Sequence, residues 1–221
     1  MIIGICGWIG TGKDTIADYL CTFHEFRRES FANTLKDAVA AVFGWDRILL
    51  EGKTREARAW REQVDPWWAE RLGMPDLTPR WVLQYWGTEV CRRAFHDDIW
   101  IASLERRLTK TSDNIVISDC RFANEVSAIK RAGGQIVWVQ RNGKPQWYDC
   151  AMLTLTTPAD QQWMISDQEQ DMEHCYPEVH VSEWHWLNTE FDAIIDNNGT
   201  IDDLYSQIRG LVPEIPVSNP N

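Results

Sequence analysis

The chain lacks any long hydrophobic run. Within its 221 residues, no apolar stretch reaches the roughly 18 residues that a membrane-spanning helix needs. Residues 1–6 are apolar, but the run is short and has no basic flank, unlike a secretory signal. We therefore expect a soluble, cytoplasmic protein without a membrane partner.

Positive charge is also scarce. The sequence has 22 Lys and Arg residues against 33 Asp and Glu residues, which gives a formal net charge of -11. Binding to nucleic acid depends on basic side chains that neutralise phosphates, so this composition argues against a nucleic-acid partner. A free nucleotide needs only a local cationic pocket. Arginines that lie close together in the sequence and can form one are Arg55, Arg58, Arg61, Arg80, Arg92 and Arg93.

Closely spaced cysteine pairs are absent as well. The six cysteines are spread along the chain without a C-x-x-C pair, so we expect reduced thiols rather than a disulfide framework. A zinc site is an alternative, because His174, Cys175 and His180 follow Cys150 in one region. Their spacing fits no common zinc-ligand pattern, which favours a region without zinc.

Apolar runs of strand length alternate with helical periodicities along the chain. Strands are predicted at residues 1–6, 26–31, 114–119, 135–140 and 191–195. Helices are predicted at residues 15–23, 34–43, 78–93, 99–108, 123–131 and 200–208. This alternation predicts an α/β fold, in which helices cover both faces of a parallel sheet and ligands bind at the carboxyl ends of the strands.

We expect one domain that spans residues 1–221. Its core comprises three stretches, about 1–44, 78–141 and 184–212. Residues 45–77 are rich in charge and Trp and indicate helical pieces of an insertion, whereas residues 142–183 indicate a lid or a long loop. The proline-containing tail, 213–221, is expected to fray.

A phosphate-binding loop follows the first predicted strand. The stretch Gly7-Trp8-Ile9-Gly10-Thr11-Gly12-Lys13 matches G-x-x-x-x-G-K and directly precedes a predicted helix, which is the context that this motif requires. The glycines allow backbone N–H groups to point at phosphates, the helix N-terminus adds partial positive charge, and the lysine reaches the β and γ oxygens. The alternative is a plain glycine turn with a surface lysine.

The residue after this lysine departs from the motif. Asp14 stands where Ser or Thr is usual, and Thr15 comes one place later. A carboxylate so near the phosphates costs free energy unless it meets Mg²⁺, another cation or an acceptor proton. Asp14 is therefore a candidate for the reaction, with a stabilising role at the helix N-terminus as the alternative.

A second acidic position ends the predicted strand 114–119. Asp119 lies where an acid that holds Mg²⁺ through water would sit, and Arg121 follows two residues later. In phosphoryl transfer such an arginine neutralises charge on the migrating oxygens. The alternative for Asp119 is capping of the next helix.

Several spaced motifs agree in order with one family. They are Gly-Lys-Asp-Thr at 12–15, Phe31-Ala32 with Leu35-Lys36, Leu83-Gln84 with Gly87-Thr88-Glu89 and Arg92, Asp119 with Arg121-Phe122 and Asn124-Glu125, and Asn198-Gly199-Thr200 with Leu204. Together they resemble the deoxynucleoside monophosphate kinases of tailed bacteriophages, over about two-thirds of the chain. The similarity thins at 45–77 and 142–179.

The resemblance implies a nucleoside monophosphate kinase fold, with a five-stranded parallel core, an acceptor-binding region and a lid over ATP. The residues that it implies for ATP are Gly7, Gly10, Thr11, Gly12, Lys13, Asp14, Thr15 and Arg141. Those that it implies for the acceptor are Phe31, Lys36, Gln84, Thr88, Arg92, Asn124, Glu125 and Glu183, and Arg80 of the arginine group named above is a further candidate. Lys13, Asp14, Asp119 and Arg121 are the catalytic candidates, and Asp14 and Asp119 are also the candidates for Mg²⁺.

The expected reaction is transfer of a phosphoryl group from ATP to a deoxynucleoside monophosphate. Two alternatives stay open: a kinase for another small phosphorylated acceptor, similar to animal phosphomevalonate kinase, and a regulatory protein that binds ATP without transferring phosphate. The sequence also leaves open which bases are accepted, whether ribose is rejected and whether the chain forms a homodimer.

Overall fold

The computed structural model describes residues 1–167 and 170–212, so the tail predicted to fray lies outside the described residues. Contacts divide the chain into two compact units. The sheet unit comprises Met1–Glu29 and the chain from Ser112 onward, and the helical unit comprises Ser30–Thr111. The organisation as one domain with an insertion and a lid stays a prediction.

The sheet unit is built on five parallel strands in the order β2-β3-β1-β4-β5. The strands are β1 (Ile2–Cys6), β2 (Phe26–Glu29), β3 (Asn114–Ile117), β4 (Gln135–Gln140) and β5 (Ala193–Asp196). The register pairs Ile3 with Val116 on one side of β1 and Ile5 with Val137 on the other. The predicted five-stranded parallel α/β fold is confirmed.

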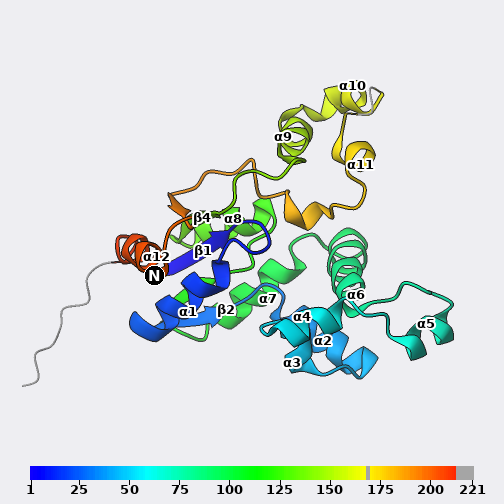
Figure 1. Ribbon diagram of the computed structural model, residues 1–221, viewed down its shortest axis with the longest axis horizontal. Coiled ribbons are helices and arrows are strands. Elements are labelled where there is room, and N and C mark those ends of the chain that lie inside the picture. Colours follow the sequence, from blue (N-terminus) through cyan, green and yellow to red (C-terminus); the bar gives the residue numbers. More distant parts are fainter. Residues whose placement is uncertain (168–169, 213–221) are drawn as a thin grey trace, which may run out of the picture. The chain divides into compact units, whose positions relative to one another are not determined.

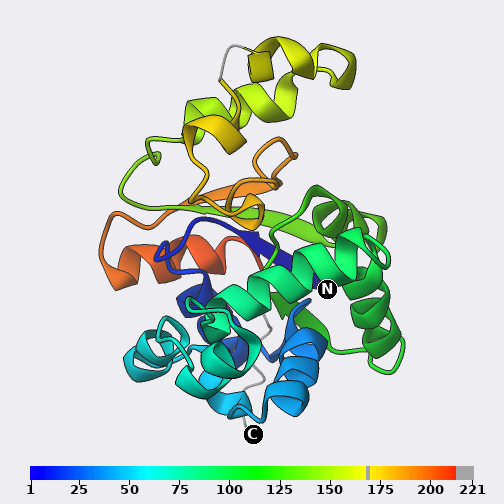
Figure 2. The same cartoon turned by 90° about the vertical axis from the view of Figure 1, so that its right-hand side faces the viewer.

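Helices cover both faces of this sheet (Figures 1 and 2). On one face, Ile3 and Ile5 of β1 are fully buried in a core with α1 (Lys13–Phe23) and α12 (Ile201–Arg209). Side chains alternate between faces along a strand, so Gly4 points to the opposite face, where α8 (Ala123–Arg131) packs. A Cβ on Gly4 would lie 2.6 Å from Ile129 Cδ1, so glycine lets α8 approach closely.

Strand β5 begins later than predicted. The expected strand started at Phe191, whereas β5 starts at Ala193. Phe191 instead packs its ring against Trp138 and Trp186, with ring centroids 5.1 and 5.9 Å away. The apolar character that indicated a strand residue therefore serves an aromatic cluster.

The segment between β4 and β5 is helical, so the expectation of a long loop is wrong. It forms α9 (Tyr148–Thr156), η2 (Ala159–Gln161), α10 (Gln162–Asp167), α11 (Met172–Cys175) and η3 (Val181–Glu183). Ala151 and Met172 are buried, and Met172 N donates to Thr154 Oγ1 at 3.2 Å, which joins α11 to α9. Its role as a lid stays a prediction.

The helical unit consists of short helices with well-defined starts. Its α-helices are α2 (Asn33–Phe43), α3 (Arg47–Glu51), α4 (Arg55–Arg61), α5 (Pro66–Leu72), α6 (Pro79–Tyr85) and α7 (Ile99–Leu108). The side chains of Asp46, Thr54, Asp65 and Thr78 each accept a backbone N–H at a helix start. The predictions of helices within residues 45–77 and of a helix start at Thr78-Pro79 are confirmed. That residues 45–77 form an insertion stays a prediction.

The predicted helix 78–93 changes its hydrogen-bond pattern midway. After α6, residues Trp86–Arg93 form a π-helix, η1. Gly87 lies within it, and a Cβ there would be 2.9 Å from Leu35 Cδ2 of α2.

Within the described residues, no helix has the length and apolar character to span a membrane.

Candidate active site

The phosphate-binding loop joins β1 to α1 in a conformation that requires glycine. Gly10 and Gly12 have φ angles of 80° and 99°, in the left-handed region. At Gly7, a Cβ would lie 2.7 Å from the carbonyl oxygen of Val139. The two glycines of the motif, Gly7 and Gly12, and Gly10 between them therefore each meet a steric or conformational demand of the loop.

Lys13 folds back over this loop. Its Nζ donates to the carbonyl oxygens of Gly7 at 2.6 Å and Trp8 at 2.7 Å. Burial lowers the pKa of Lys13 from 10.5 to about 8, and the nearby positive charge of Arg121 adds to this effect. Phosphate oxygens would give the ammonium group stronger, charged partners than these two carbonyls.

Thr11 and a residue outside the motif brace the loop. Thr11 is buried, and its Oγ1 donates to Trp8 O at 2.9 Å. Asn197, which follows β5, donates from Nδ2 to Thr11 O at 2.8 Å. Thr15, predicted to bind ATP, lies half-buried in the first turn of α1. Asn197 was not among the predicted site residues, because its link to the loop arises only when β4 pairs with both β1 and β5.

Asp14 has a cationic partner that the sequence analysis missed. Arg28 of β2 pairs with Asp14 through Nη2, which also donates to Ser118 Oγ at 2.6 Å. Ser118 Oγ in turn donates to Asp14 Oδ1 at 3.2 Å. The free-energy cost of a carboxylate beside the phosphate loop is thus reduced within the chain. The sequence feature that could have identified this partner was Arg28 itself, a charged residue inside the predicted strand 26–31.

Arg121 is held in an acidic environment. Its Nη1 donates to Glu183 Oε1 at 2.6 Å, in an ion pair between the chain after β3 and η3. Burial works to lower the pKa of Arg121, but the carboxylates of Glu183, Asp119 and Glu125 raise it above its usual value. The structure thus brings the predicted residues Arg121, Asp119 and Glu183 together.

Glu125 supports the backbone of this region. The buried carboxylate accepts from Arg121 N at 2.7 Å and from Phe122 N at 3.1 Å, at the start of α8. This arrangement favours a role in positioning Arg121 over the predicted contact with the acceptor. Asn124 is half-buried in the first turn of the same helix, and Asp119 is half-buried just after β3.

The charges around Lys13 form one cluster in the sheet unit. The electrostatic environment that sets its pKa includes Arg121, Glu183 and Asp14. The cations Lys13 and Arg121 and the carboxylates of Glu183 and Asp14 therefore influence one another electrostatically, and Arg28 pairs with Asp14. Arg141 is placed differently: it is exposed after β4 and makes no hydrogen bond or ion pair with the described residues.

The predicted acceptor residues of the helical unit mostly have partners inside that unit. Lys36 Nζ pairs with Glu51 Oε2 at 2.8 Å, and Arg80 Nη1 pairs with Glu62 Oε1 at 3.1 Å. Phe31 is buried. A ligand phosphate that binds Lys36 or Arg80 would compete with these carboxylates for the positively charged group.

Three further predicted acceptor residues lie on α6 and η1. Gln84 is half-buried, and Thr88 is buried. Arg92 is only 4% exposed, and its Nη1 donates to Asp97 O at 2.9 Å and lies 3.4 Å from Asp97 Oδ1. Their contact with an acceptor stays a prediction, and Arg92 Nη1 is already engaged by Asp97.

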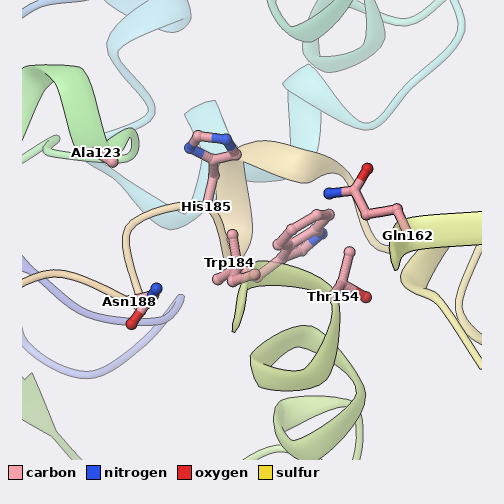
Figure 3. Close-up of a pocket in the computed structure, with 7 residues that line it drawn as sticks. Ala123, Thr154, Gln162, Trp184, His185 and Asn188 are labelled. Carbon is pink, nitrogen blue, oxygen red and sulfur yellow. The ribbon is translucent and has the colours of Figure 1, made fainter. Parts of the chain in front are cut away.

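A pocket of about 360 Å³ opens in the sheet unit (Figure 3). Its lining residues are Ala123, Thr154, Leu155, Gln162, Trp184, His185 and Asn188. Trp184 directly follows Glu183, and Ala123 comes two residues after Arg121. Trp184 is buried, and its Nε1 has no hydrogen-bond partner among the described residues.

A bound divalent cation would have few carboxylate ligands from the described part of the chain. No group of three or more His, Cys, Asp or Glu residues in the described part of the chain is arranged to hold a metal ion. Magnesium commonly binds through one or two carboxylates together with substrate phosphates. Asp14 and Asp119 in the sheet unit are compatible with that mode, and the ion pair with Arg28 engages Oδ1 of Asp14.

The chain has two viral relatives along nearly its whole length. It is 28% identical over 227 residues to a protein of Acanthamoeba polyphaga mimivirus that is provisionally named a deoxynucleotide monophosphate kinase, with 96% of each chain covered. It is 23% identical over 243 residues to the deoxynucleoside-5'-monophosphate kinase of Escherichia phage T5, with 88% of this chain and 91% of the phage protein covered. No protein-family model matches the sequence. The predicted resemblance is therefore confirmed by similarity to these two proteins.

Solved structures are similar only at a coarse level. TT1252 from Thermus thermophilus matches with a TM-score of 0.42 at 17% identity, over 96% of this chain and 95% of that one. Shikimate kinase from Bacteroides thetaiotaomicron matches with a TM-score of 0.36 at 11% identity, over 96% of each chain. Similarity at this level supports no inference about function.

Proposed function

We propose that this chain is a deoxynucleoside monophosphate kinase, which transfers the γ-phosphoryl group of ATP to the phosphate of a dNMP in the cytoplasm. The observation that carries the proposal is that two cations lie near each other at a glycine loop. Arg121 is close enough to Lys13 for its positive charge to lower the pKa of that lysine. The similarity to viral proteins with this name, over 96% and 88% of the chain, supports the choice of acceptor.

The proposed reaction is a direct transfer. An oxygen of the dNMP phosphate forms a bond to the γ-phosphorus, the bond from that phosphorus to the β–γ bridging oxygen breaks, and ADP leaves with the electron pair. Lys13 and Arg121 stabilise negative charge on the migrating group, and backbone N–H groups of the loop hold the donor phosphates. No covalent intermediate with the protein is needed.

The remaining roles follow the predicted assignment. Mg²⁺ would supply neutralisation of the phosphate charge, with Asp14 and Asp119 as the carboxylates that hold it, directly or through water. The helical unit supplies acceptor contacts from Lys36, Gln84 and Arg92. Residues 142–183 act as a lid that excludes water, which otherwise competes with the acceptor.

The test is an assay of ADP release with all four deoxy and all four ribo monophosphates, and with mevalonate phosphate as an outgroup. We expect activity with at least one dNMP. Lys13→Ala should abolish transfer, whereas the control Lys53→Ala, at an exposed position of the helical unit, should leave it unchanged. A fully active Lys13→Ala enzyme would overturn the proposal, and activity with mevalonate phosphate alone would favour the other kinase.

The role of Arg121 needs a separate measurement. Arg121→Ala should lower kcat by at least about a hundredfold, because the lost interaction forms mainly in the transition state. The melting temperature is measured in parallel. A loss of activity that is fully explained by unfolding at the assay temperature would contradict a catalytic role for Arg121.

A further inference from the structure

Trp8, the second residue of the phosphate-binding loop, lies in an aromatic cluster. The residue is only 8% exposed. Its ring centroid lies 5.7 Å from Trp138, 6.3 Å from Trp147, 6.1 Å from Tyr148 and 6.0 Å from Trp186. Trp8 Nε1 has no hydrogen-bond partner among the described residues, so ring packing is what positions this side chain.

The neighbours of Trp8 mark both ends of the helical segment between β4 and β5. Trp147 and Tyr148 form the start of α9, where the segment begins. Trp186 comes just after η3, where it ends, and Trp138 belongs to β4. One side chain of the phosphate loop therefore touches the chain at the entrance and at the exit of this segment.

The backbone of Trp8 is hydrogen-bonded to Lys13. The Trp8 carbonyl oxygen accepts from Lys13 Nζ at 2.7 Å and from Thr11 Oγ1 at 2.9 Å. A bound phosphate would draw the ammonium group of Lys13 away from this carbonyl, which then loses its charged partner. The same residue thus has its backbone in the phosphate site and its side chain in the cluster.

We propose that Trp8 is a positioning residue that couples occupancy of the phosphate loop to the helical segment 142–183. The proposal rests on the proposed function, because ATP is the ligand of the loop. When Lys13 transfers from the Trp8 carbonyl to a phosphate, the loop adjusts and the indole carries the change into Trp147, Tyr148 and Trp186. Rings in direct contact transmit such a shift because each limits the movement of the next.

Hydrogen exchange of the full chain tests the coupling, with and without Mg²⁺ and a non-hydrolysable ATP analogue. In the wild type we expect slower exchange both at residues 7–15 and at residues 147–156. Trp8→Leu should keep protection at 7–15 but lose it at 147–156. The control Trp100→Leu alters a tryptophan of equal exposure, 8%, in the helical unit and should retain both.

Two outcomes separate this proposal from the proposed function. Protection at 147–156 that persists in Trp8→Leu would overturn the coupling while ATP binding stands. An absence of protection at 7–15 in the wild type would overturn ATP binding and the coupling with it.

A second readout uses the milder variant Trp8→Phe, which keeps an aromatic ring. If Trp8 helps residues 142–183 to exclude water, the ratio of ATP hydrolysis to phosphoryl transfer should rise by about tenfold in Trp8→Phe. The KM for ATP should change much less, because backbone N–H groups of the loop bind the phosphates. A variant that is merely less stable would lose both rates together, and an unchanged ratio in a folded Trp8→Phe enzyme would contradict the proposal.

Discussion

At the scale of single residues, the site contains charged groups whose placement lowers the stability of the fold when no ligand is bound. Lys13 lies among protein atoms and next to Arg121, which is why its pKa falls to about 8. Asp14 stands beside a loop built to bind anions, and Arg28 compensates it. The lowered pKa of Lys13 supports the proposed role of this loop in binding phosphate, and the ion pair with Arg28 offsets the negative charge of Asp14.

Replacing Lys13 by Met should raise the stability of the chain without ligand, although Lys13 is proposed to be essential for activity. The pKa of Lys13 is about 8 in the folded chain and 10.5 ordinarily, so the charged form is disfavoured by folding. That cost is complete below about pH 8 and disappears as the pH rises from about 8 to 10.5, because only the unfolded chain then keeps the proton. Without ligand, Lys13→Met should therefore melt higher than the wild type at pH 7, and the difference should shrink above pH 8.

The control for this experiment is Lys53→Met, which changes an exposed lysine of the helical unit. Its melting temperature should follow the wild type across the same pH range. A Lys13→Met protein that is less stable than the wild type at pH 7 would show that the ammonium group is favourable in the fold.

Arg28 and Asp14 are suited to a double-mutant cycle. Arg28→Ala leaves the Asp14 carboxylate without this cation near the phosphates, so the KM for ATP should rise by about fivefold, the size expected for a partly exposed ion pair. Asp14→Asn added to Arg28→Ala should restore much of the lost affinity. Arg27→Ala, on the same strand but paired with Asp113, is the matched control.

The two roles considered for Asp14 predict different results in that cycle. If Asp14 holds Mg²⁺ during turnover, Asp14→Asn should lower kcat, and the double variant should recover the KM without recovering kcat. Equal kcat values in the wild type and Asp14→Asn would contradict a role for Asp14 as a metal ligand.

At the scale of elements, the helical unit depends on ion pairs between its first helices. Glu51 at the end of α3 accepts from Lys36 of α2 at 2.8 Å and also pairs with Arg47. Burial works to raise the pKa of Glu51, but Lys36 and Arg47 lower it from 4.5 to about 2. These contacts occupy the ammonium group that was predicted to bind the acceptor.

Glu51→Gln should destabilise the chain at neutral pH but not in acid. A depressed pKa stabilises the fold fully above pH 4.5, and this stabilisation is lost as the pH falls from 4.5 to about 2. The difference in melting temperature between the wild type and Glu51→Gln should therefore be constant from pH 8 to 5 and shrink below pH 4.5. Glu105→Gln, at an exposed position of α7, is the control, and a gap that does not change with pH would contradict the ion-pair explanation.

At the scale of the whole molecule, the two compact units divide the predicted site residues. The phosphate loop, Asp119, Arg121 and Glu183 belong to the sheet unit, whereas Lys36, Gln84 and Arg92 belong to the helical unit. A ligand that binds only the folded sheet unit should stabilise it by mass action. At about 100 times its Kd, one bound ligand adds about 2.7 kcal/mol to the free energy of unfolding.

Mg²⁺ with ATP should therefore raise the melting temperature by several degrees. Lys13→Ala should show little or no increase. Removal of Mg²⁺ with a chelator should reduce the increase in the wild type, since the phosphates then lose their main counter-charge. An increase of equal size in Lys13→Ala would mean that ATP stabilises the chain from another site.

The sequence by itself determined the local parts of this protein. The glycine loop is one contiguous string whose backbone requirements are visible residue by residue, and the alternation of apolar runs with helical periods predicted the parallel sheet. The helices between β4 and β5 escaped prediction because they are short, from three to nine residues, and carry too little periodicity.

Only the tertiary structure decided how the site is charged and braced. Asp14 meets Ser118 across 104 positions of sequence, and Arg121 meets Glu183 across 62. These contacts depend on the strand order β2-β3-β1-β4-β5, which brings the ends of distant strands together and which no local pattern specifies. Local conformation follows from neighbouring residues, but the pairing of distant charges follows from how the strands assemble.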